Sequence, residues 1–187
     1  MPEEVRESRV GMNKIYTIGH STRTADELVA LLSAHEVDLL VDVRTIPRSH
    51  HNPQFNSDVL PATLGKAAIA YTHLRSLGGL RRPDPNSRNL GWRNASFRGY
   101  ADYMQTREFG EAIEDLLALA STREVAIMCA EAVPWRCHRS LIADALLARG
   151  IETSEIVSTE QTTPHKLTSF ARIEGTTVAY PPEGLAL

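Results

Sequence analysis

The segment CAEAVPWRCHRS, residues 129–140, holds most of the side chains whose types could carry chemistry. It contains two thiols, Cys129 and Cys137, together with the carboxylate of Glu131 and the imidazole of His138. A thiolate is a nucleophile, and carboxylate and imidazole groups exchange protons. The segment therefore indicates covalent or acid–base catalysis by these four residues, and it leaves open which cysteine reacts.

The spacing within this segment disfavours three familiar uses of cysteine. A cysteine-dependent phosphatase loop has arginine as the sixth residue after its cysteine, whereas that position after Cys129 is Trp135 and Arg136 comes one residue later. Cys129 and Cys137 are also too far apart for a thioredoxin-type pair, which has two intervening residues. A metal site formed by both thiols and His138 is conceivable, but neighbouring arginines would repel a cation. We therefore expect no metal.

The same segment has the signature of an anion-binding helix start. Proline is favourable at the first position of a helix, so Pro134 predicts a helix over 134–149. The first N–H groups of a helix point outward and carry the positive end of its dipole, which attracts anions. Arg136 and Arg139 add formal charge near that end. We expect phosphate to bind there.

Polar residues and glycines also follow the other predicted strands. In chain order they are His20, Ser21, Asp42, Arg44, Arg48, Ser49, Gly78 and Gly79. Ligands of open α/β sheets bind outside the carboxyl ends of the strands, so we expect a single site at that edge. We expect His20 to join the catalytic groups and the substrate to be bound by Ser21, Asp42, Arg44, Gly78, Gly79, Arg136 and Arg139.

The elements that must position these residues follow from apolar periodicity. Strands are predicted at 14–18, 38–43, 69–74, 124–129 and 151–157, and helices at 24–35, 58–68, 97–107, 108–121 and 134–149. Thr24 and Glu27 have the spacing of a capping box at the first helix. This alternation predicts an α/β fold, namely a Rossmann-like, open, mostly parallel sheet with helices on both faces. We expect one domain over 14–160, a polar extension over 1–13 and a tail over 161–187.

Composition sets the class of protein. The chain has 187 residues, 42% of them apolar, and a net charge of −3, which excludes disorder as its main state. No apolar run approaches the roughly 20 residues of a membrane span, and the first residues lack the apolar stretch of a signal peptide. Two cysteines are too few for a disulfide scaffold. We expect a cytoplasmic protein without a membrane partner.

Arginine is concentrated in one part of the chain. The 20 basic residues are 17 Arg and 3 Lys, and residues 75–100 hold six Arg against one acid, Asp84. The planar guanidinium group suits phosphate oxygens. Residues 78–99 show no periodicity, and so long a loop is uncommon without a functional reason. This loop is a second candidate for anion binding.

Several of these motifs resemble the bacterial and archaeal domain-of-unknown-function family 488. The matching pieces are YTIGHSTRT at 16–24, LLVDVRTIPRS at 39–49, LGGLRR at 77–82, FRGYADYM at 97–104 and MCAEAVPWRCHRSLIADAL at 128–146. The resemblance implies a Rossmann-like fold and no established activity. It carries the family's usual polar positions onto His20, Ser21, Asp42, Arg44, Gly78, Gly79, Cys129, Glu131, Cys137, His138 and Arg139. Similar proteins often end the last strand with a Val-x-His-Ile-like piece, where this chain has EIVSTEQ at 155–161.

Two functions fit these observations. The first is an enzyme that acts on a phosphate-bearing substrate, a nucleotide or a nucleic acid, and uses a cysteine with acid–base neighbours. The alternative is a non-catalytic module that binds a nucleotide or nucleic acid through the arginine-rich loop at 75–100. The sequence leaves the cofactor and the oligomeric state open.

Overall fold

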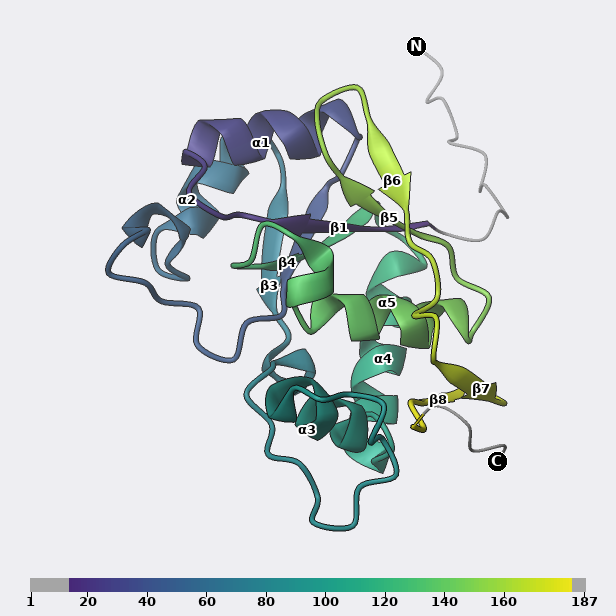
Figure 1. Cartoon of the computed structure of the whole chain (residues 1–187). Coiled ribbons are helices and arrows are strands. Elements are labelled where there is room, and N and C mark those ends of the chain that lie inside the picture. Colours follow the sequence, from purple (N-terminus) through teal and green to yellow (C-terminus); the bar gives the residue numbers. More distant parts are fainter. Residues whose placement is uncertain (1–13, 183–187) are drawn as a thin grey trace.

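A sheet of six strands forms the centre of the computed structural model, which describes residues 14–182 (Figure 1). In chain order the strands are β1 (Ile15–Gly19), β2 (Leu39–Asp42), β3 (Ala70–His73), β4 (Val125–Cys129), β5 (Thr153–Ile156) and β6 (Thr162–Pro164). Their order across the sheet is β3-β2-β4-β1-β5-β6. The first five are parallel and β6 pairs antiparallel with β5. The predicted open, mostly parallel sheet is confirmed.

Helices cover both faces of the sheet, as expected. On one face lie α1 (Ala25–Ala34) and α2 (Leu60–Gly65), and on the other α3 (Ala95–Tyr103), α4 (Arg107–Ala120) and α5 (Arg139–Leu147) (Figure 1). Three short 3-10 turns join them, η1 (Pro53–Phe55), η2 (Arg75–Leu77) and η3 (Pro134–Arg136). The described chain is one α/β domain.

Strand β4 shows how the sequence divides the core. All five residues of VAIMC are buried, as in a parallel strand covered on both sides. Successive side chains point to opposite faces, so Ala126 and Met128 pack with α1 and α2. Ile127 and Cys129 face α4 and α5 instead. The alternation therefore places the Cys129 thiol on the side from which α5 begins.

The predicted start of the last helix is wrong. Pro134 opens only the 3-10 turn η3, Cys137 is extended with φ −132° and ψ 142°, and α5 begins at Arg139. The extended backbone turns the side chain of Cys137 into the core, where it is 4% exposed. Proline suits the first position of either kind of helix, so local sequence does not distinguish them.

Residues beyond 160, which the sequence assigned to a tail, complete the structure. Strand β6 extends the sheet, and β7 (Arg172–Glu174) pairs with β8 (Thr177–Ala179) in a hairpin. Val178 and Tyr180 are buried against the α4 and α5 side. The extension expected over 1–13 lies outside the described residues, as do residues 183–187. No helix within 14–182 has the length and apolar character needed to span a membrane.

Candidate active site at the carboxyl edge of the sheet

The connections that leave the neighbouring strands β1 and β4 run to opposite faces of the sheet. From β1 the chain crosses to α1 on one face, and from β4 it crosses to α5 on the other, although the two strands are neighbours. A crevice outside the carboxyl ends of such strands is the usual ligand site of open α/β sheets. Two backbone hydrogen bonds hold its loops together, from His20 N to Cys129 O (3.0 Å) and from Ser21 N to Ala130 O (2.9 Å).

Glycine is required where these loops meet. A Cβ atom on Gly19 would lie 1.8 Å from the carbonyl oxygen of Glu131, well inside contact distance. The next turn adds backbone strain, because Ser21 has φ +51° in the left-handed region that few side-chain-bearing residues adopt. Strained backbone of this kind is common at functional sites.

A cleft of about 440 Å³ opens at this crevice. It is lined by His20, Ser21, Thr22, Arg44, Ile46, Arg48, Ser49, Asn52, Ala130, Glu131 and Ala132. Six of the residues expected at this edge are therefore brought together there, namely His20, Ser21, Arg44, Arg48, Ser49 and Glu131. Arg48, which the sequence placed further along the same loop, has an exposed guanidinium whose ion pair with Asp58 (3.2 Å) is also exposed.

Arg44 is tied into a buried network. Its Nη2 donates to Asp42 Oδ2 at 2.5 Å and to the carbonyl oxygen of Phe55 at 2.7 Å, and its Nε donates to Asp42 Oδ1 at 2.9 Å. Tyr71 donates its hydroxyl to the same carboxylate at 2.7 Å. Asp42 is fully buried and Arg44 is 6% exposed. The pair thus fixes the end of β2, and only Nη1 of Arg44 faces His20.

His20 uses both of its ring nitrogens within the fold. Nδ1 donates to Ser21 O at 2.9 Å, which leaves Nε2 to accept from Arg44 Nη1 at 3.3 Å. The ring stacks on Phe55 with centroids 4.2 Å apart. Burial lowers the pKa of His20 to about 4, so the ring is neutral at pH 7. In this arrangement His20 positions the loop that lines the cleft.

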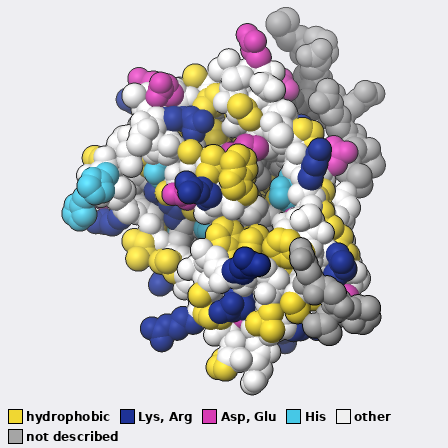
Figure 2. Space-filling model, in the orientation of Figure 1, with side chains coloured by type: hydrophobic (Ala, Val, Ile, Leu, Met, Phe, Trp, Pro, Cys, Tyr) yellow, Lys and Arg dark blue, Asp and Glu magenta, His cyan; other side chains and the backbone are white. Residues whose placement is uncertain are grey.

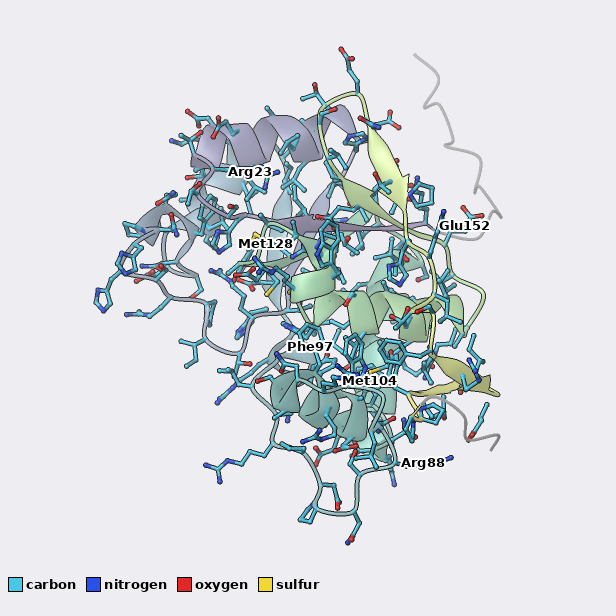
Figure 3. The ribbon with its side chains drawn as sticks, viewed as in Figure 1. Arg23, Arg88, Phe97, Met104, Met128 and Glu152 are labelled. Atoms are coloured by element: carbon cyan, nitrogen blue, oxygen red, sulfur yellow. The ribbon has the colours of Figure 1, made fainter. Side chains whose placement is uncertain are left out.

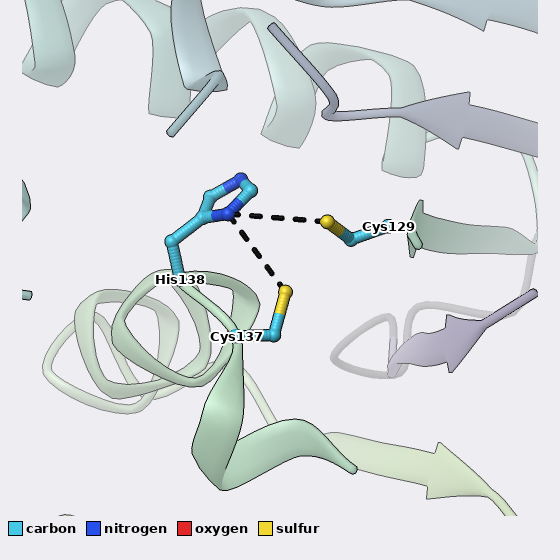
Figure 4. Close-up of side chains that lie close together, drawn as sticks. All are labelled: Cys129, Cys137 and His138. Atoms are coloured by element: carbon cyan, nitrogen blue, oxygen red, sulfur yellow. Dashed lines mark hydrogen bonds between the residues drawn. The ribbon is translucent and has the colours of Figure 1, made fainter. Parts of the chain in front are cut away.

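Both thiols gather around His138. Its Nδ1 lies 3.9 Å from Cys129 Sγ and 3.8 Å from Cys137 Sγ, as Figure 4 shows. Its Nε2 donates to Val43 O at 3.0 Å, so Nδ1 of the neutral ring carries a lone pair toward the sulfurs. The sulfurs belong to buried residues, 8% and 4% exposed, and neither residue lines the cleft. Sequence reasoning named all three residues and considered them together only as a disfavoured metal site.

The two thiols differ in acidity. A hydrogen bond from Cys129 lowers the pKa of Cys137 to about 7, against the opposing effect of burial, and the charge of Arg139 lowers it further. The same hydrogen bond, together with burial, raises the pKa of Cys129. Cys137 is therefore the more acidic of the two thiols.

Arg139 points into the protein and is fully buried. It donates from Nη1 to Glu131 O (2.5 Å), from Nη2 to Ala132 O (3.0 Å) and Glu155 Oε1 (2.9 Å), and from Nε to Glu155 Oε2 (3.4 Å). Every nitrogen of the guanidinium is thus engaged. With η3 only three residues long, no helix N-terminus exists at Pro134 to hold an anion. Arg136, in η3, is exposed and does not line the cleft.

The remaining glycines pack the far side of the thiol cluster. A Cβ on Gly78 would lie 2.9 Å from Thr45 Cα, and one on Gly79 would lie 3.0 Å from His138 Nδ1. Thr45 donates its hydroxyl to Gly79 O at 2.8 Å. Gly78 therefore allows the loop to approach Thr45 and Gly79 allows it to approach the imidazole, and neither glycine lines the cleft.

Two partners of the site were missed by sequence reasoning. Glu155 pairs with Arg139 and Tyr71 with Asp42, but the sequence shows neither contact. A signal existed for Glu155, since it is an acidic residue inside a mostly buried strand. The sequence of strand β3 contains nothing to show that Tyr71 donates a hydrogen bond to Asp42.

Two of the six arginines in the 75–100 loop contact residues outside it, and a third, Arg98, bonds Trp92 within it. Arg81 lies 3.6 Å over the ring of Tyr103, Arg88 pairs with Glu174 at 3.2 Å, and Arg98 donates to a backbone carbonyl. The others, Arg75, Arg82 and Arg93, are exposed. On the face shown in Figure 2, basic side chains lie scattered among acidic and apolar ones. Arg88 lies at the edge of the molecule, away from Met128 in β4 (Figure 3).

Comparison with known proteins agrees with the motifs. Residues 24–146 match the family described as "Domain of unknown function DUF488". Neither a curated protein nor a solved structure matches the chain. The match covers most of the domain, including both thiols, His138 and the Asp42–Arg44 pair. The chain belongs to the DUF488 family.

Proposed function

We propose that this chain is an enzyme that acts on a phosphate-bearing compound, a nucleotide or nucleic acid, through a cysteine with acid–base neighbours. One observation carries the proposal: the Cys129–Cys137–His138 cluster lies at the end of the strand whose next three residues, 130–132, line the cleft. Thiol, imidazole, carboxylate and guanidinium groups thus lie at one edge of the sheet, where the connections from β1 and β4 run to opposite faces. Such convergence is typical of active sites.

The cleft offers groups for the phosphate. Arg48 is 68% exposed, and its ion pair with Asp58 is of the exposed kind that contributes little to stability. Its guanidinium can therefore exchange Asp58 for a phosphate oxygen at small cost. Ser21 and Thr22 add hydroxyl donors at the same rim. The buried Arg44 contributes positive charge near the floor, although Asp42 compensates most of it.

The cluster supplies the reacting group. With Nε2–H fixed on Val43 O, Nδ1 of His138 accepts the thiol proton of Cys137. Cys137 is 4% exposed and does not line the cleft, so the substrate reaches its sulfur only when the cleft opens further. The thiolate then bonds to an electrophilic atom of the substrate while the bond to the leaving group breaks, and His138 returns the proton to that group. Water releases the product and gives its proton back to the sulfur. Glu131, exposed on the rim, is placed to exchange protons on the cleft side.

Two arginines form a matched pair for testing the binding site. Arg48 and Arg88 each make an exposed ion pair of 3.2 Å, but only Arg48 lines the cleft. Calorimetric titration with inorganic phosphate and a set of nucleotides should show affinity about ten- to a hundredfold weaker in Arg48→Ala. Arg88→Ala should bind like the wild type. Weaker binding in Arg88→Ala alone would favour the non-catalytic module, which would bind the anion through the exposed arginines of the 75–100 loop. No binding to any of these proteins would refute the phosphate part of the proposal.

Catalysis is tested separately, on protein kept free of metal by a chelator. Turnover of the nucleotides that bind should be lost in Cys137→Ser, while their affinity is unchanged, because this thiol acts in the reaction step alone. His138→Gln should lower turnover at every pH tested. A Cys137→Ser variant that keeps wild-type turnover would exclude the thiol as the reacting group.

A further inference from the structure

We propose that Cys129, Cys137 and His138 form a binding site for one zinc ion. These three residues offer two sulfurs and one nitrogen, and all three atoms lie within 4.8 Å of one another. Cys129 ends β4, and Cys137 and His138 are the two residues between η3 and α5 (Figure 4). Thiolate and imidazole are the ligands that zinc takes in proteins.

The distances nearly match a tetrahedral site. Zinc–sulfur bonds of about 2.3 Å and zinc–nitrogen bonds of about 2.0 Å put neighbouring ligand atoms about 3.6 Å apart. The Nδ1 of His138 is 3.9 Å from the Cys129 sulfur and 3.8 Å from the Cys137 sulfur. Each of these two contacts must shorten by about 0.2–0.3 Å to reach that value. The two sulfurs, which lie within 4.8 Å of each other, must approach to about 3.8 Å. The sulfurs are not joined in a disulfide.

The imidazole is held in the state that a metal requires. A histidine ligand usually donates its other ring N–H to a carbonyl or carboxylate, which fixes the tautomer and the ring direction. His138 does so through Nε2 to Val43 O at 3.0 Å. The ring is further held by Tyr100, with centroids 5.0 Å apart, and by the close approach of Gly79. The lone pair of Nδ1 is therefore aimed at the space beside the sulfurs before any ion arrives.

Local charge also favours a cation more than the sequence indicated. Two buried arginines near the cluster are paired, Arg44 with Asp42 at 2.5 Å and Arg139 with Glu155 at 2.9 Å. Arg136, the residue before Cys137, is exposed, so solvent screens its charge. Each pair is close to neutral, so the repulsion expected from the arginines is largely cancelled. A zinc ion with two thiolates is also neutral overall. Burying this assembly is accordingly far less costly than burying an isolated ion.

The site has three protein ligands. Among residues 14–182 no fourth histidine, cysteine or carboxylate atom joins the group. Zinc sites with three protein ligands keep their fourth position for water or substrate, whereas structural sites close it with a fourth side chain. A fourth ligand of this buried site would therefore be water or a small molecule rather than a side chain of the described residues.

Metal content and spectroscopy test the site directly. The reduced full chain is stripped with a chelator, incubated with zinc sulfate, dialysed and analysed for bound metal. We expect one zinc per chain. Cobalt(II) chloride should bind in its place and produce sulfur-to-metal charge-transfer absorption together with intense visible bands, which report thiolate ligands in a tetrahedral site. Zinc should displace the cobalt and remove both features.

Ligand variants and a matched histidine provide the controls. Cys129→Ser, Cys137→Ser and His138→Gln should each weaken zinc binding by more than about a hundredfold. His35→Gln is the control, because His35 is also half-buried and also contacts a backbone carbonyl, Ser158 O, through Nε2 at 2.7 Å. It should bind zinc like the wild type. Circular dichroism shows which variants remain folded.

The proposal is overturned if the folded, reduced wild type binds neither zinc nor cobalt, or if cobalt binds without charge-transfer absorption. Both results come from the wild type, so they hold even where a variant fails to fold. Retention of zinc by a folded Cys129→Ser, Cys137→Ser double variant would overturn it as well. The zinc site and the thiol reaction use the same atoms of Cys137 and His138, so they describe the metal-loaded and the metal-free chain respectively. The site does not rest on the proposed function, since the turnover assay uses metal-free protein and the metal assay uses no substrate. Each can therefore fail alone.

Discussion

Replacing Arg139 by methionine should destabilise the protein rather than weaken its binding of phosphate. The Arg139 side chain is fully buried and Glu155 is 13% exposed. Methionine has a similar length, so the substitution removes the charge and the donors while filling most of the space. Four hydrogen bonds are lost, two to backbone carbonyls and two to the Glu155 carboxylate. What remains is a largely buried carboxylate without its partner, together with the carbonyls of residues 131 and 132.

The magnitude follows from that geometry. Removing one member of a buried ion pair typically costs about 3–5 kcal/mol, because the other charge stays buried without compensation. The Thr17 hydroxyl still donates to Glu155 and water can reach the exposed part of the carboxylate, so the lower half of this range is expected. For a domain of this size a loss of about 3 kcal/mol lowers the melting temperature by about 6–12 °C.

Urea unfolding and a double-mutant cycle measure the effect. Glu155→Gln in the Arg139→Met background removes the uncompensated charge, so the double variant should be more stable than Arg139→Met alone. The coupling between the two substitutions should be about 1–3 kcal/mol. Wild-type stability in Arg139→Met, combined with loss of nucleotide affinity, would refute this reasoning and restore the role that the sequence suggested for this arginine.

Two further substitutions test the loops of the site. Gly19→Ala places a methyl group 1.8 Å from Glu131 O and should lower the free energy of unfolding by about 1–3 kcal/mol. Gly110→Ala is the control, because Gly110 lies in α4 with nothing within 4 Å of its Cβ position, and it should raise the free energy of unfolding by about 0.5–1 kcal/mol. Equal effects of the two substitutions in urea unfolding would contradict the contact assigned to Gly19. His20 has a pKa of about 4 in the folded chain against about 6.5 in the unfolded chain. Between these values the unfolded state binds more protons, so the contribution of His20 to stability is fully present above about pH 6.5 and is lost as the pH falls toward about 4. His20→Gln should flatten this pH dependence by at most about 3 kcal/mol. The exposed His50→Gln should not change it, and identical slopes in all three proteins would refute the buried neutral ring.

Local pattern sufficed for most of the architecture. The five parallel strands and the helices α1 to α4 lie close to their predicted ranges, because each combines apolar periodicity with a clear boundary. Helix α1 is an example, since Thr24 Oγ1 accepts from Glu27 N at 3.1 Å and Glu27 accepts from Thr24 N at 2.6 Å, as the capping-box spacing predicts. The hairpin of β7 and β8 was not predicted, because its few buried residues sit in a stretch too short and polar to show a period.

The candidate site was less accessible to sequence reasoning. Its residues could be named because parallel strands all end at one edge, and the cleft does collect His20, Ser21, Arg44 and Glu131. Nothing local, however, tells whether a guanidinium points outward to a ligand or inward to a carboxylate. That choice depends on a partner elsewhere in the chain, such as Glu155 for Arg139, and so it appears only in the folded structure.

Charge around the thiols makes the same point. Counted along the sequence, residues 129–140 carry two arginines and one glutamate, which argues for an anion and against a metal. Counted in space, Arg139 belongs with Glu155 of β5, and the nearby Arg44 belongs with Asp42 of β2. Since Coulomb energies depend on distance and on burial, the carboxylates of neighbouring strands weigh more than the next residue in the chain. Ligand preference at this sheet edge is therefore a property of the strand order β2-β4-β1-β5, which brings Asp42 and Glu155 to either side of the strand pair that carries the site.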